Sequence, residues 1–375
     1  MIEAKGLADS WPATGPKQLW SRALGEGHSS IVVDNARLYT MYSKDDQESV
    51  IALDAASGKT VWEKSYEAPT AGLKLENGNG PHSTPLVVGN LLFTVGVVGK
   101  MHALDKMTGK VVWSHDLYKD YGGQRMGRGY SCSPLAYKGM VIVTVGGPGQ
   151  ALIAFDQKSG AIAWKKQDFD LSPSTPLIIT VDGQDQLVIV LADKIVGLTP
   201  NNGELLWSHP HPCDWGLNIS LPLWGEGNIL FVSSAYSGGS RALQLSQSGG
   251  KTTVKELWAS RRMRVHHSTM VRLGDLVFGS SGDFGPAPMT ALDVKTGSVV
   301  WQNLSFPKTN FVYADGKVIL LDEDGNLALV RLSREGMKVI SKVPVLTNRA
   351  WTPPTLAGTK LYIRDRKTIM ALDLS

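Results

Sequence analysis

Three histidines occupy the same position of a repeated sequence pattern, and they are the chain's clearest candidates for chemistry. His28, His82 and His267 each stand directly before a serine, in GHSSI, PHSTP and HHSTM. Related segments without this histidine recur as YSCSP, SPSTP, NISLP, KTNFV and AWTPP. Imidazole is a common metal ligand and a proton carrier near neutral pH. The pattern indicates a histidine-based metal or acid–base site, or a ring of polar residues that bind water and backbone groups.

A second repeat predicts the elements that position these histidines. In most copies an Ala/Gly-Leu-Asp segment is followed by Ser/Thr-Gly and then by a tryptophan, eight residues after the aspartate. The clear copies end at Trp62, Trp113, Trp164, Trp207 and Trp301, and a looser copy ends at Trp258. The leucine position recurs eight times at intervals of 37 to 51 residues. Such periods, built from short strands, are typical of propeller blades.

We therefore expect an all-β fold, an eight-bladed β-propeller of four-stranded blades that forms one domain over residues 1–375. The last repeat stops at Ser375 without its tryptophan, whereas Trp20 has no preceding Ala-Leu-Asp strand. Pairing of the N- and C-terminal strands in one blade would complete both and close the ring. The repeated glycines should supply positive φ in hairpins, and the tryptophans should pack between blades.

Propeller geometry limits which histidines can share a metal ion. If blades pack about 10 Å apart, their inner strands lie roughly 13 Å from the axis. His82 and His267 belong to opposite blades, so we do not expect them to bind one ion directly. His28 with His82, or His266 with His267, could form a smaller site. The metal candidates are thus His28, His82, His266 and His267, and the catalytic candidates are His28, His82 and His267.

The loops that enter the inner strands supply candidate ligand-binding residues. They cover residues 66–81, 118–130, 209–217 and 260–265, and they should share one face of the disc. Their arginines indicate an anionic or carboxylate-bearing ligand, the alternative being ordinary solvated charge. Together with the inner-strand register, the candidates are Arg128, Tyr130, Ser131, Trp215, Asn218, His266, Asn310, Arg349 and Trp351.

Composition excludes several classes of function. The 38 basic and 34 acidic side chains give a net charge of +4, which calls for neither nucleic acid nor an anionic membrane. No run of about 20 apolar residues predicts membrane insertion. Cys132 and Cys213 are too few for a disulfide framework. No basic segment followed by an apolar one is visible at the N-terminus, so no signal peptide is predicted.

The spaced tryptophan repeat resembles the pyrroloquinoline-quinone (PQQ)-like repeat family, eight-bladed propellers with tryptophan docking motifs. It is most similar to the short bacterial PQQ-binding-like repeat proteins. The family includes the quinoprotein alcohol dehydrogenases and the propeller lipoprotein of the outer-membrane β-barrel assembly machinery, which is a binding scaffold. The resemblance covers essentially the whole chain and implies a periplasmic or exported location.

Resemblance to the dehydrogenases implies a vicinal disulfide above PQQ, a Ca²⁺ site with an acidic ligand and a catalytic aspartate. Cys132 and Cys213 are 81 residues apart and no Cys-Cys pair exists, so we do not expect PQQ to bind. We expect a platform that binds a small-molecule or protein ligand at the mouth of the central channel. The alternative is an enzyme that uses this mouth. It would be a hydrolase or lyase with a divalent metal on the channel histidines, or a quinoprotein-like oxidoreductase.

Overall fold

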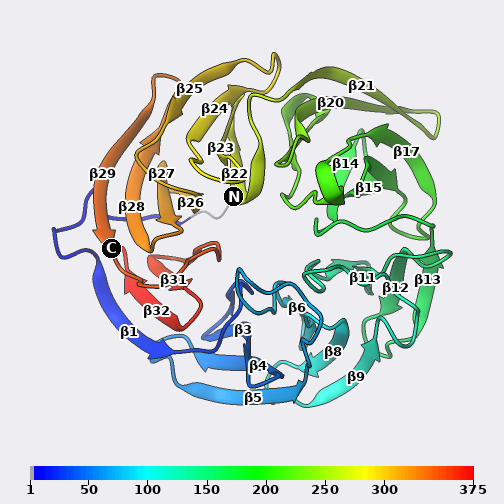
Figure 1. Cartoon of the computed structure of the whole chain (residues 1–375), viewed down its shortest axis with the longest axis horizontal. Coiled ribbons are helices and arrows are strands. Elements are labelled where there is room, and N and C mark those ends of the chain that lie inside the picture. The colour runs from blue at the N-terminus through cyan, green and yellow to red at the C-terminus, as the bar shows by residue number, and fades with distance from the viewer. Residues whose placement is uncertain (1–3) are drawn as a thin grey trace.

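The structure is a computed structural model that describes residues 4–375, and it is a ring of eight sheets around a central axis (Figure 1). Each sheet in this part of the chain has four antiparallel strands, ordered from an inner strand to an outer strand. The prediction of an all-β, eight-bladed propeller is confirmed. None of the helices in the described residues has the length and apolar character needed to cross a membrane.

Blades 1 to 4 follow one another along the chain, each with its inner strand first. Blade 1 contains β2 (Val32–Asp34), β3 (Arg37–Lys44), β4 (Gln47–Asp54) and β5 (Thr60–Glu67). Blade 2 contains β6 (Leu86–Val88), β7 (Leu91–Val95), β8 (Lys100–Asp105) and β9 (Val111–Asp116). Blade 3 contains β10 (Leu135–Tyr137), β11 (Met140–Thr144), β12 (Leu152–Asp156) and β13 (Ile162–Lys166). Blade 4 contains β14 (Leu177–Val181), β15 (Gln184–Val190), β16 (Lys194–Leu198) and β17 (Leu205–Pro210).

Blades 5 to 7 continue this order and include two short 3₁₀ helices. Blade 5 contains β18 (Leu223–Gly225), β19 (Ile229–Ser234), β20 (Gly239–Ser248) and β21 (Lys251–Ser260), with η1 (Asp214–Gly216) before it and η2 (Glu226–Asn228) inside it. Blade 6 contains β22 (Val265–Leu273), β23 (Leu276–Ser281), β24 (Met289–Asp293) and β25 (Val299–Asn303). Blade 7 contains β26 (Thr309–Ala314), β27 (Lys317–Asp322), β28 (Asn326–Leu332) and β29 (Met337–Pro344).

Blade 8 joins the two ends of the chain. Its inner strands are β30 (Thr355–Ala357), β31 (Lys360–Arg364) and β32 (Thr368–Asp373), and its outer strand is β1 (Lys17–Ala23). Strand β1 runs antiparallel to β32, from Lys17 opposite Asp373 to Ala23 opposite Thr368 (Figure 1). The predicted closure of the ring by the N- and C-terminal strands is confirmed.

The repeat motif encodes the hairpin between the third and the outer strand of a blade. In blade 2, Trp113 lies opposite Ala103, and the other repeat tryptophans also face alanine or glycine across the sheet. A small residue is needed there because the indole ring lies across it. The motif aspartate caps the turn: Asp105 Oδ1 accepts hydrogen bonds from the Thr108 backbone N–H at 2.9 Å and hydroxyl at 2.7 Å.

The tryptophans also connect neighbouring blades. Trp62 of blade 1 donates from Nε1 to the carbonyl of Lys106 in blade 2 at 3.0 Å, and Trp113 makes the same contact with Gln157 of blade 3. Gly109 has φ +72° and lies under Trp62, where a Cβ atom would come within 2.5 Å of the ring. This glycine is therefore required both by the turn and by the tryptophan packed on it.

Replacing Gly109 with alanine is expected to lower the free energy of unfolding by more than 2 kcal/mol, roughly the upper end of the backbone strain alone. The excess arises because the new methyl group must displace the Trp62 ring. Gly89 of the same blade is a matched control, since its φ is +56° and nothing lies within 4 Å of its ideal Cβ. Urea denaturation of both variants tests this. Equal losses would mean that contact between blades is not what requires glycine.

Candidate functional site

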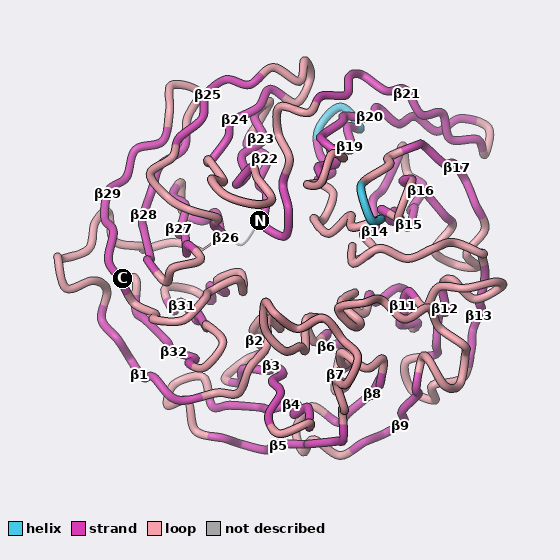
Figure 2. The backbone as a smooth tube through the Cα atoms, in the orientation of Figure 1, coloured by secondary structure: helices cyan, strands magenta, loops and turns pink. Residues whose placement is uncertain are grey.

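Loops surround the central opening of the ring (Figure 2), and two sets of them are joined to each other; we call the face that they share the channel mouth. One set is the predicted one, which links each outer strand to the next inner strand. The other consists of the hairpin loops between the second and third strands of each blade. Backbone hydrogen bonds join the two sets, as from Asp214 N–H to the Tyr236 carbonyl at 3.0 Å and from Gly282 N–H to the Arg264 carbonyl at 2.8 Å.

The Ser/Thr-rich register forms a belt of hydrogen bonds that runs from blade to blade under the mouth. Ser133 N–H of blade 3 donates to Thr175 Oγ1 at 2.9 Å, and Asn310 of blade 7 donates from Nδ2 to the Trp351 carbonyl at 2.8 Å. The other links are Thr84 N–H to Ser133 Oγ, Ser174 Oγ to the Ser220 carbonyl, Ser220 Oγ to the His266 carbonyl, Thr269 N–H to Asn310 Oδ1, and Thr352 Oγ1 to the His28 carbonyl. These hydroxyl and amide groups bind backbone, as one of the two interpretations of the register expects.

Several predicted ligand-binding residues are used by the scaffold itself. Tyr130 is buried and donates to the Thr144 carbonyl at 3.0 Å. Asn218 is also buried and donates to the Leu191 carbonyl at 2.6 Å. Ser131 is half-buried and donates to the carbonyl of Gly129 in its own loop at 3.3 Å. These three residues and Asn310 therefore hold the loops and blades in place rather than offering free donors to a ligand.

Six rings make a continuous chain of contacts across the mouth. Their successive ring-centroid distances are 5.7 Å for His82 and His28, 5.5 Å for His28 and Trp351, 4.4 Å for Trp351 and His267, 4.7 Å for His267 and His266, and 4.7 Å for His266 and Tyr236. The structure thus brings together the three register histidines, His266 and Trp351. Sequence reasoning missed Tyr236, which lies on the hairpin between β19 and β20.

A β-bulge places the histidine pair of blade 6 at the mouth. In β22, Val265 pairs with Ser281, and the next paired residue is Met270, opposite Gly279. The four residues between them face a single residue of β23, so they leave the regular ladder and the strand is re-aimed. This local irregularity brings His266 toward Tyr236 and His267 toward Trp351.

Cationic side chains cover Trp351. The Arg349 guanidinium lies 4.9 Å from the Trp351 ring centroid, and Lys308 Nζ lies 5.7 Å from it. Lys308 Nζ also contacts His266 Nδ1 and the Asp283 carbonyl, each at 3.1 Å. Arg128, another predicted residue, is exposed and pairs with Glu76 at 2.7 Å. Two cations therefore lie over the Trp351 ring, whose Nε1 donates to Glu323 at 2.8 Å.

Burial among these rings keeps the imidazoles neutral. It lowers the pKa of His28 to about 3, an effect increased by the neighbouring His82 and Arg364. The pKa of His82 falls to about 4 through burial, and that of His266 to about 3 through burial and the charge on Lys308. Burial likewise holds the pKa of His267 well below its ordinary value. These values are too low for efficient proton transfer near pH 7.

His28 and His82 are stacked, whereas His266 and His267 are tilted against each other and Trp351 lies between the two pairs, so the four imidazoles do not converge on a point. Within residues 4–375, no group of three or more histidine, cysteine, aspartate or glutamate side chains is placed to hold a metal ion. His28 and His82 are adjacent, as are His266 and His267, so each pair offers two imidazoles. His82 and His267, predicted to lie too far apart to share an ion, are separated by His28 and Trp351.

The mouth does not fit PQQ. Trp351, the indole at the mouth, is packed against two imidazoles and covered by two cations. The cysteines are both free, with Cys132 buried and Cys213 half-buried, and no acidic cluster suited to Ca²⁺ occurs in the described part of the chain. The donor set that the dehydrogenase resemblance implies is therefore not assembled by these residues.

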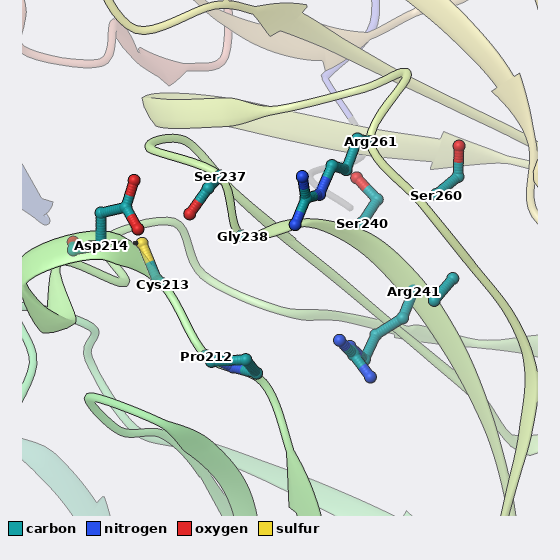
Figure 3. A pocket seen from close by; sticks show the side chains of 10 residues that line it. Pro212, Cys213, Asp214, Ser237, Gly238, Ser240, Arg241, Ser260 and Arg261 are labelled. Atoms are coloured by element: carbon teal, nitrogen blue, oxygen red, sulfur yellow. Dashed lines mark hydrogen bonds between the residues drawn. The ribbon is translucent and has the colours of Figure 1, made fainter.

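Two adjoining pockets lie among the loops around blade 5, the first beside the loop from blade 4 and the second toward blade 6. The first has a volume of about 500 Å³ and is lined by Cys213, Asp214, Ser237, Ser240, Arg241 and Arg261, among others (Figure 3). The second, of about 470 Å³, shares Asp214, Ser237 and Arg261 and adds Trp215, Tyr236, Arg264, Asp283 and Phe284. Trp215 was predicted at the mouth, whereas Tyr236 and Phe284 belong to hairpin loops that carry no repeat signature. Their shared place between the second and third strands is the signal that could have found them.

Comparison with known proteins gives the family. The family model described as outer membrane protein assembly factor BamB matches residues 8–80 and 46–303. The chain is 21% identical over 354 residues to the outer membrane protein assembly factor BamB of Yersinia pestis, covering 93% of this chain and 76% of that protein. It is 27% identical over 143 residues to the quinohemoprotein alcohol dehydrogenase ADH IIB of Pseudomonas putida, covering 36% of this chain but only 20% of that enzyme.

Solved structures agree on the fold. BamB from Moraxella catarrhalis superimposes with a TM-score of 0.64 at 20% identity, covering 95% of this chain and 97% of that chain. The quinohemoprotein alcohol dehydrogenase from Comamonas testosteroni gives a TM-score of 0.61 at 14% identity, covering 98% and 76%. BamB and an alcohol dehydrogenase thus share this propeller fold, and function must be argued from the site.

Proposed function

The chain belongs to the family of the outer membrane protein assembly factor BamB, and from this premise we propose that it is a protein-binding platform for outer membrane protein assembly. Its location would be the periplasm, and its partner would bind at the channel mouth. A propeller suits this role because a rigid ring presents many loops on one face.

The observation that most directly supports this proposal is the construction of the channel mouth. The belt of hydrogen bonds fixes all eight inner strands, so the loops above it are presented by a rigid frame. Above this frame the exposed residues include aromatic rings and arginines, the residue types enriched at protein interfaces. The four mouth histidines contact each other in two pairs, and their lowered pKa values keep them neutral. This combination favours binding over proton-transfer or metal-assisted catalysis.

Site-specific photo-crosslinking tests this function in cells of the natural host. A photoreactive residue placed at Glu76 or Arg349 reports on contacts at the mouth, since both side chains are exposed there. Val112 on β9 and Val339 on β29 are the control positions, because they are exposed on outer strands at 49% and 38%. We expect both mouth positions to crosslink the same outer membrane assembly component and both control positions to remain uncrosslinked.

Two results would contradict the proposal. Equal crosslinking from Val112 and Val339 would place the binding surface on the rim of the ring instead of its mouth. Failure of both mouth positions, with the protein present in normal amount in the periplasmic fraction, would remove the platform role itself.

A further inference from the structure

The two adjoining pockets around blade 5 form a groove with an unusual backbone. Within residues 4–375, eleven residues other than glycine have positive φ, and six of them are asparagine or aspartate. Three of the remaining five line the second pocket: Trp215 at φ +58°, Tyr236 at +48° and Ser237 at +74°. Such strained backbone clusters at functional sites, where the fold holds side chains in place for a ligand.

Two aromatic rings of this groove are exposed to solvent. Trp215 is 75% exposed and Phe284 is 77% exposed, the highest values among the large apolar residues described. Both contact Tyr236, at ring-centroid distances of 5.2 and 5.6 Å. Both rings therefore contact Tyr236 and keep most of their surface exposed, where it can receive an apolar or aromatic side chain.

The same groove contains hydrogen-bond donors without partners. Lys308 Nζ donates to His266 Nδ1, so a neutral His266 carries its proton on Nε2 and donates it to Tyr236 Oη at 2.5 Å. The phenol proton of Tyr236 is then free for an acceptor in the groove. Arg261 lines both pockets, is exposed, and has no ion-pair partner among the residues described. By contrast, Arg241 pairs with Glu256 at 2.6 Å, and Arg264 lies 3.6 Å from Asp283.

The first pocket has a polar wall on each side. Figure 3 shows Cys213, Asp214 and Ser237 on one side and Arg241 and Ser260 on the other. An extended peptide has backbone N–H groups for Asp214 and carbonyl or carboxylate groups for the arginine side. The groove therefore offers complementary groups to a chain, beyond what a single small anion would use.

We propose that this groove binds a segment of a partner protein in which a carboxylate side chain lies next to an aromatic one. Trp215 and Phe284 would hold the aromatic side chain, and Arg261 with the Tyr236 hydroxyl would hold the carboxylate. The proposal rests on the platform function proposed above and names the chemistry of the partner.

Fluorescence anisotropy with defined peptides tests the groove on the intact protein. The probe is a fluorescein-labelled peptide with a central phenylalanine flanked by aspartates. The comparison peptides replace the aspartates with lysine or the phenylalanine with serine. We expect saturable binding of the probe, weakened about tenfold by each comparison change, which corresponds to about 1.4 kcal/mol.

Variants of the protein test which residues of the groove bind the probe. Trp215→Ala, Phe284→Ala and Arg261→Glu are each expected to raise the Kd of the probe by about tenfold or more. Met107→Ala is the matched control, because Met107 is also an exposed apolar residue but lies in the hairpin between β8 and β9. Trp215→Gly should weaken binding to the same extent as Trp215→Ala and raise thermal stability, since glycine accepts φ +58° without strain.

Three outcomes would overturn the proposed role of the groove in peptide binding. They are no binding of the probe, equal binding of the lysine peptide, or an unchanged Kd in the Trp215 and Phe284 variants. Equal affinity for phenylacetate would also overturn it, because the occupant would then be a small carboxylate. The crosslinking positions Glu76 and Arg349 lie outside the groove lining. Crosslinking there without peptide binding would reject the groove alone, whereas loss of both would reject the platform function as well.

Discussion

Replacing Arg364 with methionine is expected to lower the free energy of unfolding by about 3 kcal/mol or more, a severe loss for one side chain. Arg364, at the end of β31, is the largest fully buried side chain described. Its guanidinium donates to the carbonyl of Met41 at 2.7 Å and to Thr40 Oγ1 at 3.1 Å. Further bonds reach the carbonyls of Gly25 at 3.2 Å and Ser29 at 3.3 Å.

The position of these acceptors explains the size of the effect. All four belong to the segment that runs from β1 into blade 1, so Arg364 ties blade 8 to blade 1 at the seam where the ring closes. Burial lowers its pKa to about 10, so the group stays charged at neutral pH. Methionine fills much of the space but removes the guanidinium donors to the carbonyls of Met41 and Gly25, whereas the Ser29 carbonyl keeps the Thr40 hydroxyl as a donor.

Arg366 provides a matched control two residues away at the same seam. It is half-buried and pairs with Glu26 at 2.7 Å, with solvent access to both partners. A solvent-accessible pair of this kind contributes about 1 kcal/mol or less. Urea denaturation should therefore separate Arg364→Met from Arg366→Met. If the two variants lose equal stability, the buried guanidinium is not what holds the seam.

The fold was predictable because its information is local and repeated. Each Asp-to-Trp segment specifies one hairpin through turn chemistry that acts over a few residues, as Asp105, Thr108 and Gly109 show. The incomplete repeat at Ser375 and the unpaired segment around Trp20 predicted the closure that β1 and β32 make. Period and turn residues were sufficient for the number and order of the blades.

The site was predictable only in part. The shared register identified His28, His82 and His267, but their contacts depend on features that carry no repeat. A bulge in β22 aims His267 at Trp351, and a hairpin loop supplies Tyr236. Residue type alone could not decide whether Tyr130, Asn218 and Asn310 bind a ligand. Polar side chains at such positions can equally form hydrogen bonds with buried backbone groups. Their hydrogen bonds run to the scaffold.

Acidification from pH 6.5 to pH 5 is expected to destabilise the protein steeply. Burial is the main cause that lowers the pKa of six histidines: His28, His211 and His266 to about 3, His82 and His102 to about 4, and His267 well below its usual range. Nearby cations add to this, including Lys308 beside His266 and Arg241 beside His211.

The direction of this pH dependence follows from the difference in proton binding between the unfolded and the folded chain. The unfolded chain protonates these histidines as the pH falls below about 6.5, whereas the folded chain does not until the pH approaches their lowered pKa values. The contribution of these histidines to the free energy of unfolding is therefore fully present above pH 6.5. It is lost as the pH falls toward 4, by at most about 1.4 kcal/mol per pH unit for each histidine. Burial raises the pKa of Glu48 to about 7, which acts in the opposite sense, because its folded form binds a proton more readily. The net uptake on unfolding near pH 5 should approach five protons.

Urea denaturation at several pH values between 7 and 5 measures this proton uptake as the slope of unfolding free energy against pH. Replacing His28 and His82 together with glutamine should reduce the slope by close to two protons, since both groups stop titrating. Glu48→Gln should steepen the slope by close to one proton, because it removes the opposing contribution. Both are changes of slope, so they stay measurable even if the variants start from lower stability. A slope near zero, or a Glu48→Gln slope shallower than that of the unmodified protein, would show that these six histidines do not govern acid stability.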